Sequence, residues 1–157
     1  MMFRRFGATQ DSNAYALIIH AMIRNLLLKD EFIEAYRQLA VQMFPLYESA
    51  ARRKVSPIDR KQLQKLGEHL IQLDEDDQLV ATCVSVAVTM QVLLFCTGVE
   101  ADLLIGVKKL DEKLFAHAWV RMPDGEMIDP QNKYGDLQVT KILRLKEEAE
   151  RWAVSLG

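Results

Sequence analysis

Three side chains in the second half of the chain have the residue types of a cysteine nucleophile with its proton relay: Cys83, His117 and Asp129. Such a nucleophile needs a lowered thiol pKa, a base that moves protons and a third group that orients the base. Cys83 lies near the start of an expected helix, where free amide groups and the positive end of the helix dipole favour a thiolate. Its position therefore predicts an activated thiol.

His117 and Asp129 lie on the two strands of an expected hairpin. If Gly125 takes the left-handed position of a three-residue turn, Met122 pairs with Glu126. Asp129 then lies diagonally across from His117, within reach of the imidazole. This register predicts a hydrogen-bonded pair.

Side chains alternate across a strand, so His117, Trp119 and Asp129 are expected on one face of the hairpin. A shift of one residue in the loop would place Asp129 on the wrong face. The opposite face is expected to pack on the core through Ala116, Ala118 and Val120.

The expected chemistry is peptide hydrolysis. The thiolate of Cys83 attacks a peptide carbonyl, the imidazolium of His117 protonates the leaving amine, and Asp129 holds the imidazole tautomer. The backbone N–H of Cys83 is a natural donor to the oxyanion, and Gln78 is a candidate second donor. Trp119 is a candidate for the wall of the substrate cleft.

Each residue also has a structural interpretation when taken singly, since a buried cysteine is usually a small apolar side chain. Cys96 is expected to be structural, because it lies at the far end of the helix, where the dipole opposes a thiolate. His20, within an apolar helix, is also expected to be structural. No Cys-x-x-Cys or His-x-x-x-His spacing is present, so no metal and no cofactor are expected.

Composition restricts the class of protein. The 157 residues suit one compact unit, half of them are apolar, and a net charge of −2 argues against a nucleic-acid-binding protein. The apolar stretch 14–23 is too short to span a bilayer. Cys83 and Cys96 lie in one expected helix, roughly 20 Å apart, beyond disulfide reach. Free thiols favour the cytoplasm.

The hydrophobic pattern predicts helices first and strands afterwards. Asp30 is expected to cap a helix that Pro45 ends, and Ser56-Pro57 to begin the next helix. The expected helices span residues 13–29, 30–44, 56–73, 79–96 and 139–153, and the strands 99–107, 114–122 and 126–129. This order predicts an α+β fold in which a central Cys-bearing helix packs on a small antiparallel sheet. Residues 1–75 are expected to form a helical N-terminal region and residues 76–157 the catalytic core.

Several segments together resemble the B protein of lasso-peptide biosynthesis, over roughly residues 79 to 130. They are Cys83-Val84-Ser85-Val86-Ala87, Leu93-Leu94, Gly98, Ala101, Leu104-Ile105-Gly106-Val107 and Ala116-His117-Ala118-Trp119-Val120. The resemblance implies a transglutaminase/papain-like core in residues 76–157 and a leader peptidase. It places the family's catalytic triad on Cys83, His117 and Asp129.

The resemblance also implies a substrate and partners. The substrate is a ribosomally made precursor peptide, cut after its leader so that a macrolactam synthetase can close the core peptide. Fused family members carry a winged-helix-like leader-recognition domain with strands, whereas the first 75 residues here are predicted to be helical. The split form, acting with a separate leader-binding protein, is therefore expected. A transglutaminase-like acyltransferase and a non-catalytic peptide-binding module are the alternatives.

Overall fold

The structure is a computed structural model that describes the backbone of residues 9–156 and the side chains of residues 13–152. The elements follow in the order α1 (Thr9–Lys29), α2 (Phe32–Arg53), α3 (Arg60–Glu75), α4 (Cys83–Cys96), β1 (Asp102–Leu110), β2 (Lys113–Arg121), β3 (Met127–Ile128), β4 (Gln138–Leu143) and α5 (Leu145–Leu156).

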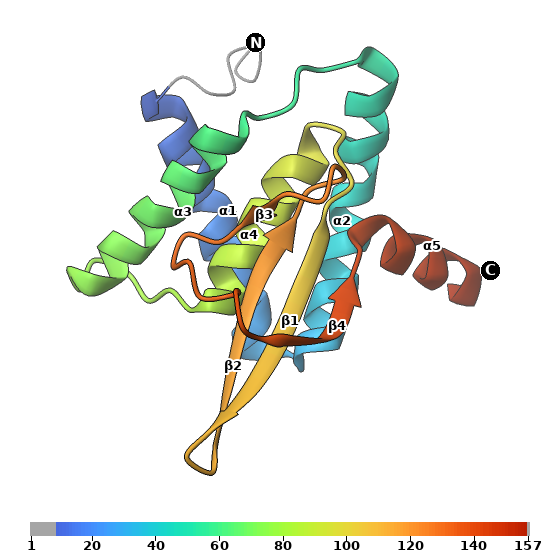
Figure 1. Cartoon of the computed structure of the whole chain (residues 1–157). Helices are drawn as coiled ribbons and strands as arrows, with labels where there is room; N and C mark the ends of the chain where they lie inside the picture. The colour runs from blue at the N-terminus through green and yellow to red at the C-terminus, as the bar shows by residue number, and fades with distance from the viewer. Residues whose placement is uncertain (1–8, 157) are drawn as a thin grey trace.

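Helices and sheet form two layers around one core. The sheet has the strand order β3-β2-β1-β4, and each neighbouring pair is antiparallel. α4 packs on β2 and β1, while α1, α2 and α3 pack around α4 and α5 packs on α2 (Figure 1). The prediction of an α+β fold with the Cys-bearing helix against a small antiparallel sheet is confirmed.

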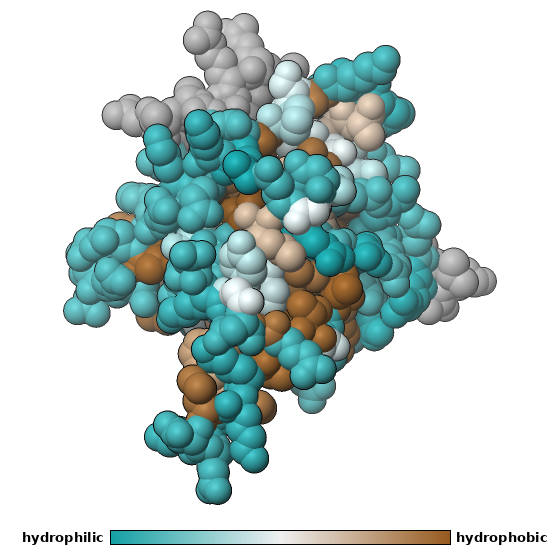
Figure 2. Space-filling view, viewed as in Figure 1, coloured by the Kyte–Doolittle hydropathy of each residue, from teal (hydrophilic) through white to brown (hydrophobic). Residues whose placement is uncertain are grey.

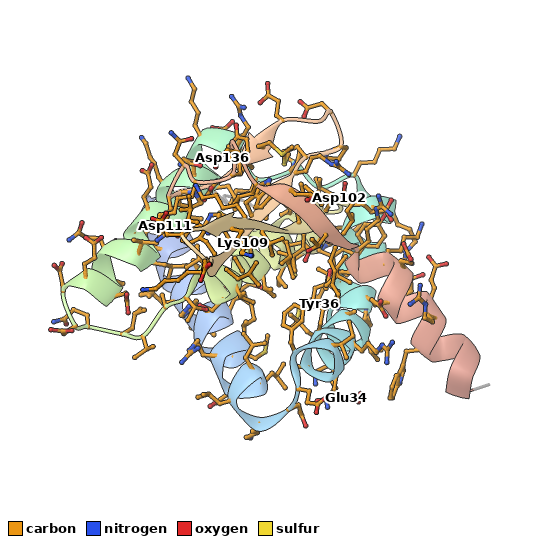
Figure 3. All side chains as sticks on the ribbon, turned by 60° about the horizontal axis from the view of Figure 1, so that its bottom comes forward. Glu34, Tyr36, Asp102, Lys109, Asp111 and Asp136 are labelled. Carbon is orange, nitrogen blue, oxygen red and sulfur yellow. The ribbon has the colours of Figure 1, made fainter. Side chains whose placement is uncertain are left out.

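α4 is the centre of this arrangement because its side chains are apolar on every face and almost all buried. Gln91 is the largest of the few polar side chains of α4, and its amide is fully bonded. Its Nε2 donates to the carbonyls of Ala101 at 3.0 Å and Leu143 at 3.1 Å, and its Oε1 accepts from the Tyr36 hydroxyl at 2.9 Å. Figure 3 shows Tyr36 pointing from α2 toward the core. One side chain thus joins α2, α4 and the sheet.

The predicted end of the second helix is wrong. Pro45 lies inside α2, which continues to Arg53, and Glu31 rather than Asp30 stands at its N-cap, without a side-chain hydrogen bond. Proline removes one helical hydrogen bond. The burial of Met43 before it and Ala50 after it favours a continuous helix.

The segment before α3 also differs from prediction. Ser56 and Pro57 are not helical, and α3 begins at Arg60. Ile58 is buried and its backbone N–H lies 3.5 Å from Thr97 Oγ1 at the end of α4. Asp59, the next residue, is the N-cap of α3 and has an extended backbone.

The two elements flanking the predicted hairpin were placed wrongly from sequence. The first strand is shifted toward the C-terminus, to Asp102–Leu110, and the expected helix over 139–153 is divided into β4 and α5. The first half of that region contains Val139, Thr140 and Ile142, which suit a strand. Pairing with the free edge of β1 therefore determines the structure there.

The register of the β2–β3 hairpin agrees with the prediction. Val120 pairs with Ile128, and the backbone N–H of Met122 donates to the carbonyl of Glu126 at 2.8 Å. Gly125 has φ +92°, a left-handed conformation that glycine adopts without steric cost. Ala118 and Val120 join the core as expected, but Ala116 is exposed. The β1–β2 hairpin extends past the helices at its turn (Figure 1).

Hydrophilic residues cover most of the face seen in Figure 2, whereas hydrophobic residues gather along the middle of the sheet. Exposed apolar side chains on the strands include Val139, Ile142 and Leu114. Within residues 9–156, no helix is long and apolar enough to cross a membrane.

The bonding of Gln91 makes a stability prediction. Gln91→Leu leaves the carbonyls of Ala101 and Leu143 and the Tyr36 hydroxyl without their partner, so we expect the free energy of unfolding to fall by about 2–3 kcal/mol. Urea denaturation measures this change. The matched control is Gln72→Leu, at an exposed amide bonded only within its own helix end, which should change it by less than about 0.5 kcal/mol. Equal effects would contradict the prediction.

Candidate active site

Cys83 is the first residue of α4, so its thiol lies at the positive end of the helix. Thr82 is the N-cap and forms a capping box with Ser85. The Ser85 N–H donates to Thr82 Oγ1 at 3.0 Å, and the Thr82 N–H donates to Ser85 Oγ at 2.8 Å. The helix was expected to begin near residue 79, and its later start brings the thiol closer to the helix end.

His117 and Asp129 form a buried pair, with His117 4% and Asp129 6% exposed. His117 Nε2 lies 2.9 Å from Asp129 Oδ2. Two backbone donors also hold the carboxylate: Gln131 N–H at 3.1 Å from Oδ1 and Lys133 N–H at 2.7 Å from Oδ2. Because Nε2 is used by Asp129, Nδ1 is the ring nitrogen left to interact with the Cys83 thiol, which lines the same cavity and whose pKa the interaction with His117 lowers.

The electrostatics favour a thiolate–imidazolium pair. The hydrogen bond with His117 lowers the pKa of Cys83 more than burial raises it, and the backbone N–H groups of Ala118 and Val84 add to this effect. Burial by itself would lower the pKa of His117, but the hydrogen bonds with Asp129 and Cys83 raise it to about 9. Burial opposes ionisation of Asp129, yet its hydrogen bonds keep the pKa of that carboxyl below its usual value.

The cavity at these three side chains is small, about 10 Å³, which is about the space of one water molecule. Part of its wall comes from the segment after β3, through Pro130 and Gln131. The whole lining is Ile71, Cys83, Val86, Ala87, Met90, His117, Ala118, Asp129, Pro130 and Gln131. α3, α4, β2 and the segment after β3 therefore all contribute to the site.

The structure does not bring Gln78 to the thiol. This side chain is exposed and donates to the carbonyl of Asp76 at 3.4 Å, within its own turn, and it is absent from the cavity wall. The sequence interpretation missed the backbone donors of Ala118, Gln131 and Lys133, because a main-chain N–H has no residue-type signal. The Asp129-Pro130 dipeptide, which favours a turn, was the available sign that the carboxylate accepts bonds from the following loop.

Trp119 is buried next to the site and does not line an open cleft. Its side chain is 1% exposed, stacks on Tyr134 at 5.9 Å between ring centroids, and points its indole N–H at Met127 Sδ, 3.3 Å away. It also stacks beside His117, at 6.1 Å. Gly106 makes room for it, since a Cβ there would lie 2.7 Å from the indole ring. The indole ring of Trp119 therefore packs against the imidazole of His117.

Cys96 lies at the other end of α4, with Sγ 3.9 Å from Met43 Sδ, and burial raises its pKa to about 12. It is a structural side chain in this geometry, as expected.

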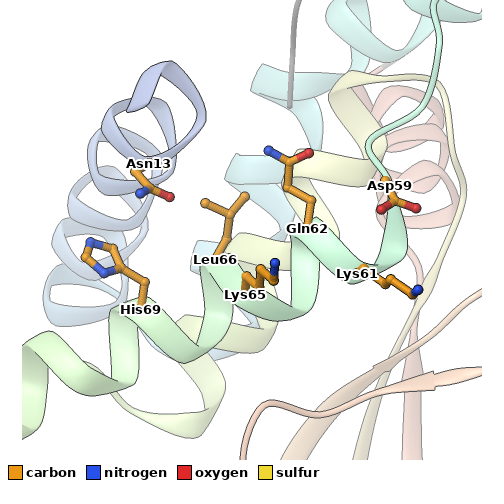
Figure 4. Close-up of a pocket in the computed structure, with 7 residues that line it drawn as sticks. All are labelled: Asn13, Asp59, Lys61, Gln62, Lys65, Leu66 and His69. Carbon is orange, nitrogen blue, oxygen red and sulfur yellow. The ribbon is translucent and has the colours of Figure 1, made fainter. Parts of the chain in front are cut away.

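A larger hollow, about 430 Å³, lies between α1 and α3 (Figure 4). Its lining consists of Asn13, Asp59, Lys61, Gln62, Lys65, Leu66 and His69. Among the described side chains, none that lines this hollow is a cysteine, serine or threonine, whereas Cys83 lines the smaller cavity. Within the described part of the chain, no three His, Cys, Asp or Glu side chains are grouped to hold a metal ion.

Comparison with known proteins identifies one family. The sequence model of the transglutaminase-like superfamily matches residues 26–144, more than half of the chain. Neither a search of curated proteins nor a search of solved structures found a match. The matched residues include α2, α3, α4 and the whole sheet, and so contain Cys83, His117 and Asp129.

The two thiols should differ in reactivity. At pH 7 we expect iodoacetamide to alkylate Cys83 at least about tenfold faster than Cys96, because only the thiolate reacts and an ordinary thiol is only slightly ionised. His117→Ala should slow the labelling of Cys83 about tenfold by removing its hydrogen-bond partner. Peptide mapping by mass spectrometry measures both rates. Labelling of the two cysteines at equal rates in the folded protein would refute an activated Cys83.

Proposed function

Because the chain belongs to the transglutaminase-like superfamily, we propose that it is a cysteine peptidase that removes the leader from a lasso-peptide precursor with a separate leader-binding protein. The single observation that carries the proposal is that Cys83, His117 and Asp129 line one small cavity, with the His117 imidazole hydrogen-bonded to Asp129. This is the arrangement that thiol acylation requires.

The chemistry follows from the charges of the three groups. The Cys83 thiolate attacks the scissile carbonyl, a C–S bond forms, and the negative charge moves to the carbonyl oxygen. The first amide groups of α4, including the Cys83 N–H, are suited to stabilise it. The C–N bond then breaks as the His117 imidazolium gives its proton to the amine. Water attacks the thioester, His117 takes its proton, and the thiolate leaves.

Asp129 keeps the His117 imidazole correctly oriented during this cycle. A carboxylate at Nε2 fixes the imidazole with Nδ1 toward the sulfur and stabilises its protonated form. The N–H donors of Gln131 and Lys133 hold the carboxylate in turn. The role of Asp129 is therefore to orient the base.

The substrate class rests on the segments that resemble the lasso-peptide B proteins. Two of them, Leu104–Val107 and Ala116–Val120, lie side by side on β1 and β2, with Gly106 opposite His117. The glycine is needed because Trp119 fills the space over it. These segments thus form the unit that supports the imidazole, which supports reading the resemblance as a shared active-site architecture.

The partner protein is part of the same proposal. Residues 9–75 fold as α1, α2 and α3, whereas the leader-recognition domain of fused members contains strands. We therefore assign cleavage to this chain and do not assign leader binding to residues 9–75.

Cys83→Ala should reduce cleavage of a precursor peptide, in the presence of the leader-binding protein, by at least about 10³-fold, because the acyl acceptor is lost. Cys96→Ala is the matched control and should retain cleavage within about twofold, since its thiol is remote from the cavity. Mass spectrometry of the products measures the rate. Full cleavage by the Cys83 variant would sink the proposal. An amine adduct in place of a free leader carboxylate would identify an acyltransferase.

The pH profile of kcat/KM should form a plateau. Activity rises as Cys83 ionises, and it falls above about pH 9, where His117 loses its proton. The direction of this pH dependence follows from the raised pKa of His117. The imidazole stays protonated well above pH 6.5, its ordinary pKa. Asp129→Asn removes the interaction that raises this pKa, so its alkaline limb should move to lower pH. A wild-type decline already centred near the ordinary histidine value would contradict this electrostatic account.

A further inference from the structure

One buried histidine takes no part in the proposed chemistry. His20 lies on α1 and is 3% exposed, and its Nε2 is 2.9 Å from the hydroxyl oxygen of buried Ser85. α1 packs along α4 (Figure 1). His20 precedes the residues that match the family model, which begin at residue 26. This contact thus adds a polar group from outside the matched region to the start of the nucleophile's helix.

Ser85 is the residue through which this contact acts. Its hydroxyl accepts the Thr82 N–H at 2.8 Å and lies 3.1 Å from the Thr82 carbonyl. The hydroxyl has one proton and two lone pairs. If the proton goes to the Thr82 carbonyl, the hydroxyl accepts from Thr82 N–H and from an N–H at His20 Nε2, and every contact is satisfied. Burial lowers the pKa of His20 to about 4, so the ring is neutral near pH 7.

The capping box that Ser85 forms encloses the nucleophile. Thr82 immediately precedes Cys83, and Ser85 follows it by two positions on the first turn of α4. The same turn supplies the Val84 N–H that lowers the pKa of Cys83. A change in the box therefore moves the sulfur relative to both its backbone donors and His117.

We propose that His20 is a positioning residue for Cys83: by donating to Ser85 it locks the capping box and so orients the thiolate toward His117. The inference rests on the proposed function, in which Cys83 is the nucleophile. His20 is hydrogen-bonded to Ser85 and is not among the residues that line the Cys83 cavity, so its effect passes through Ser85. α1 is thereby part of the catalytic unit.

The test compares iodoacetamide alkylation of Cys83 against pH in a Cys96→Ala background. His20→Leu removes the donor, and we expect the apparent pKa of Cys83 to rise and alkylation at pH 7 to slow at least about fivefold. His20→Gln places an amide N–H near the position of Nε2, and it should restore the parent rate to within about twofold. Circular dichroism and thermal melting show that each variant is folded.

A loss of core packing alone must be separated from loss of the donor. Ile23→Ala truncates another buried side chain of α1, which should lower the melting temperature without changing the pKa of Cys83. A folded His20→Leu variant with the parent alkylation profile overturns the inference, as does an Ile23→Ala variant that changes the profile equally. If His20→Leu does not fold, His20→Asn, whose shorter amide does not reach Ser85, decides by the same criterion.

These outcomes are distinct from a failure of the proposed function. If Cys83 of the parent reacts like an ordinary thiol, or Cys83→Ala still cleaves the precursor, the peptidase proposal fails. If the parent thiol is activated and His20→Leu leaves it so, only the role of His20 fails.

Discussion

The hydrogen bond between His117 and Asp129 is the interaction on which the rest of the site depends. Burying an imidazolium and a carboxylate costs several kcal/mol for each ion unless they are paired and further hydrogen-bonded. Asp129 meets this condition with the imidazole and with backbone N–H groups of Gln131 and Lys133. The conformation of the loop after β3 therefore determines where Nδ1 of His117 points, and with it whether the Cys83 thiol has a base.

The candidate site is assembled from two layers, because the thiol belongs to a helix and the other two groups to the sheet. Hydrophobic contacts alone are not directional, so the apolar side chains of α4 do little to fix its rotation and axial position. The amide of Gln91 supplies that direction, since it bonds the Ala101 and Leu143 carbonyls and the Tyr36 hydroxyl at once. A fully satisfied buried network of this kind specifies one arrangement of the layers. The hydrogen bonds of Gln91 thus hold α4 in position, although Gln91 lies far along the helix from Cys83.

The helices that precede α4 belong to the same compact arrangement. α1, α2 and α3 each pack on α4, and α3 also approaches Pro130 in the wall of the small cavity, where Gly67 leaves room for it. The family match accordingly begins within α1 and includes α2 and α3. Under the proposed function, these helices and the sheet together shape a site that acts on a peptide presented by another protein.

The sequence by itself determined the candidate residues, the thiol at a helix start and the hairpin register that places Asp129 beside His117. Those features depend on turn chemistry and side-chain alternation over a few neighbouring residues. It did not determine that α2 continues through Pro45, that residues 138–143 form a strand, or that Trp119 is covered by Tyr134. Only the tertiary structure decided these points and the meeting of Cys83 with His117, because each depends on burial or pairing between segments that no local pattern connects.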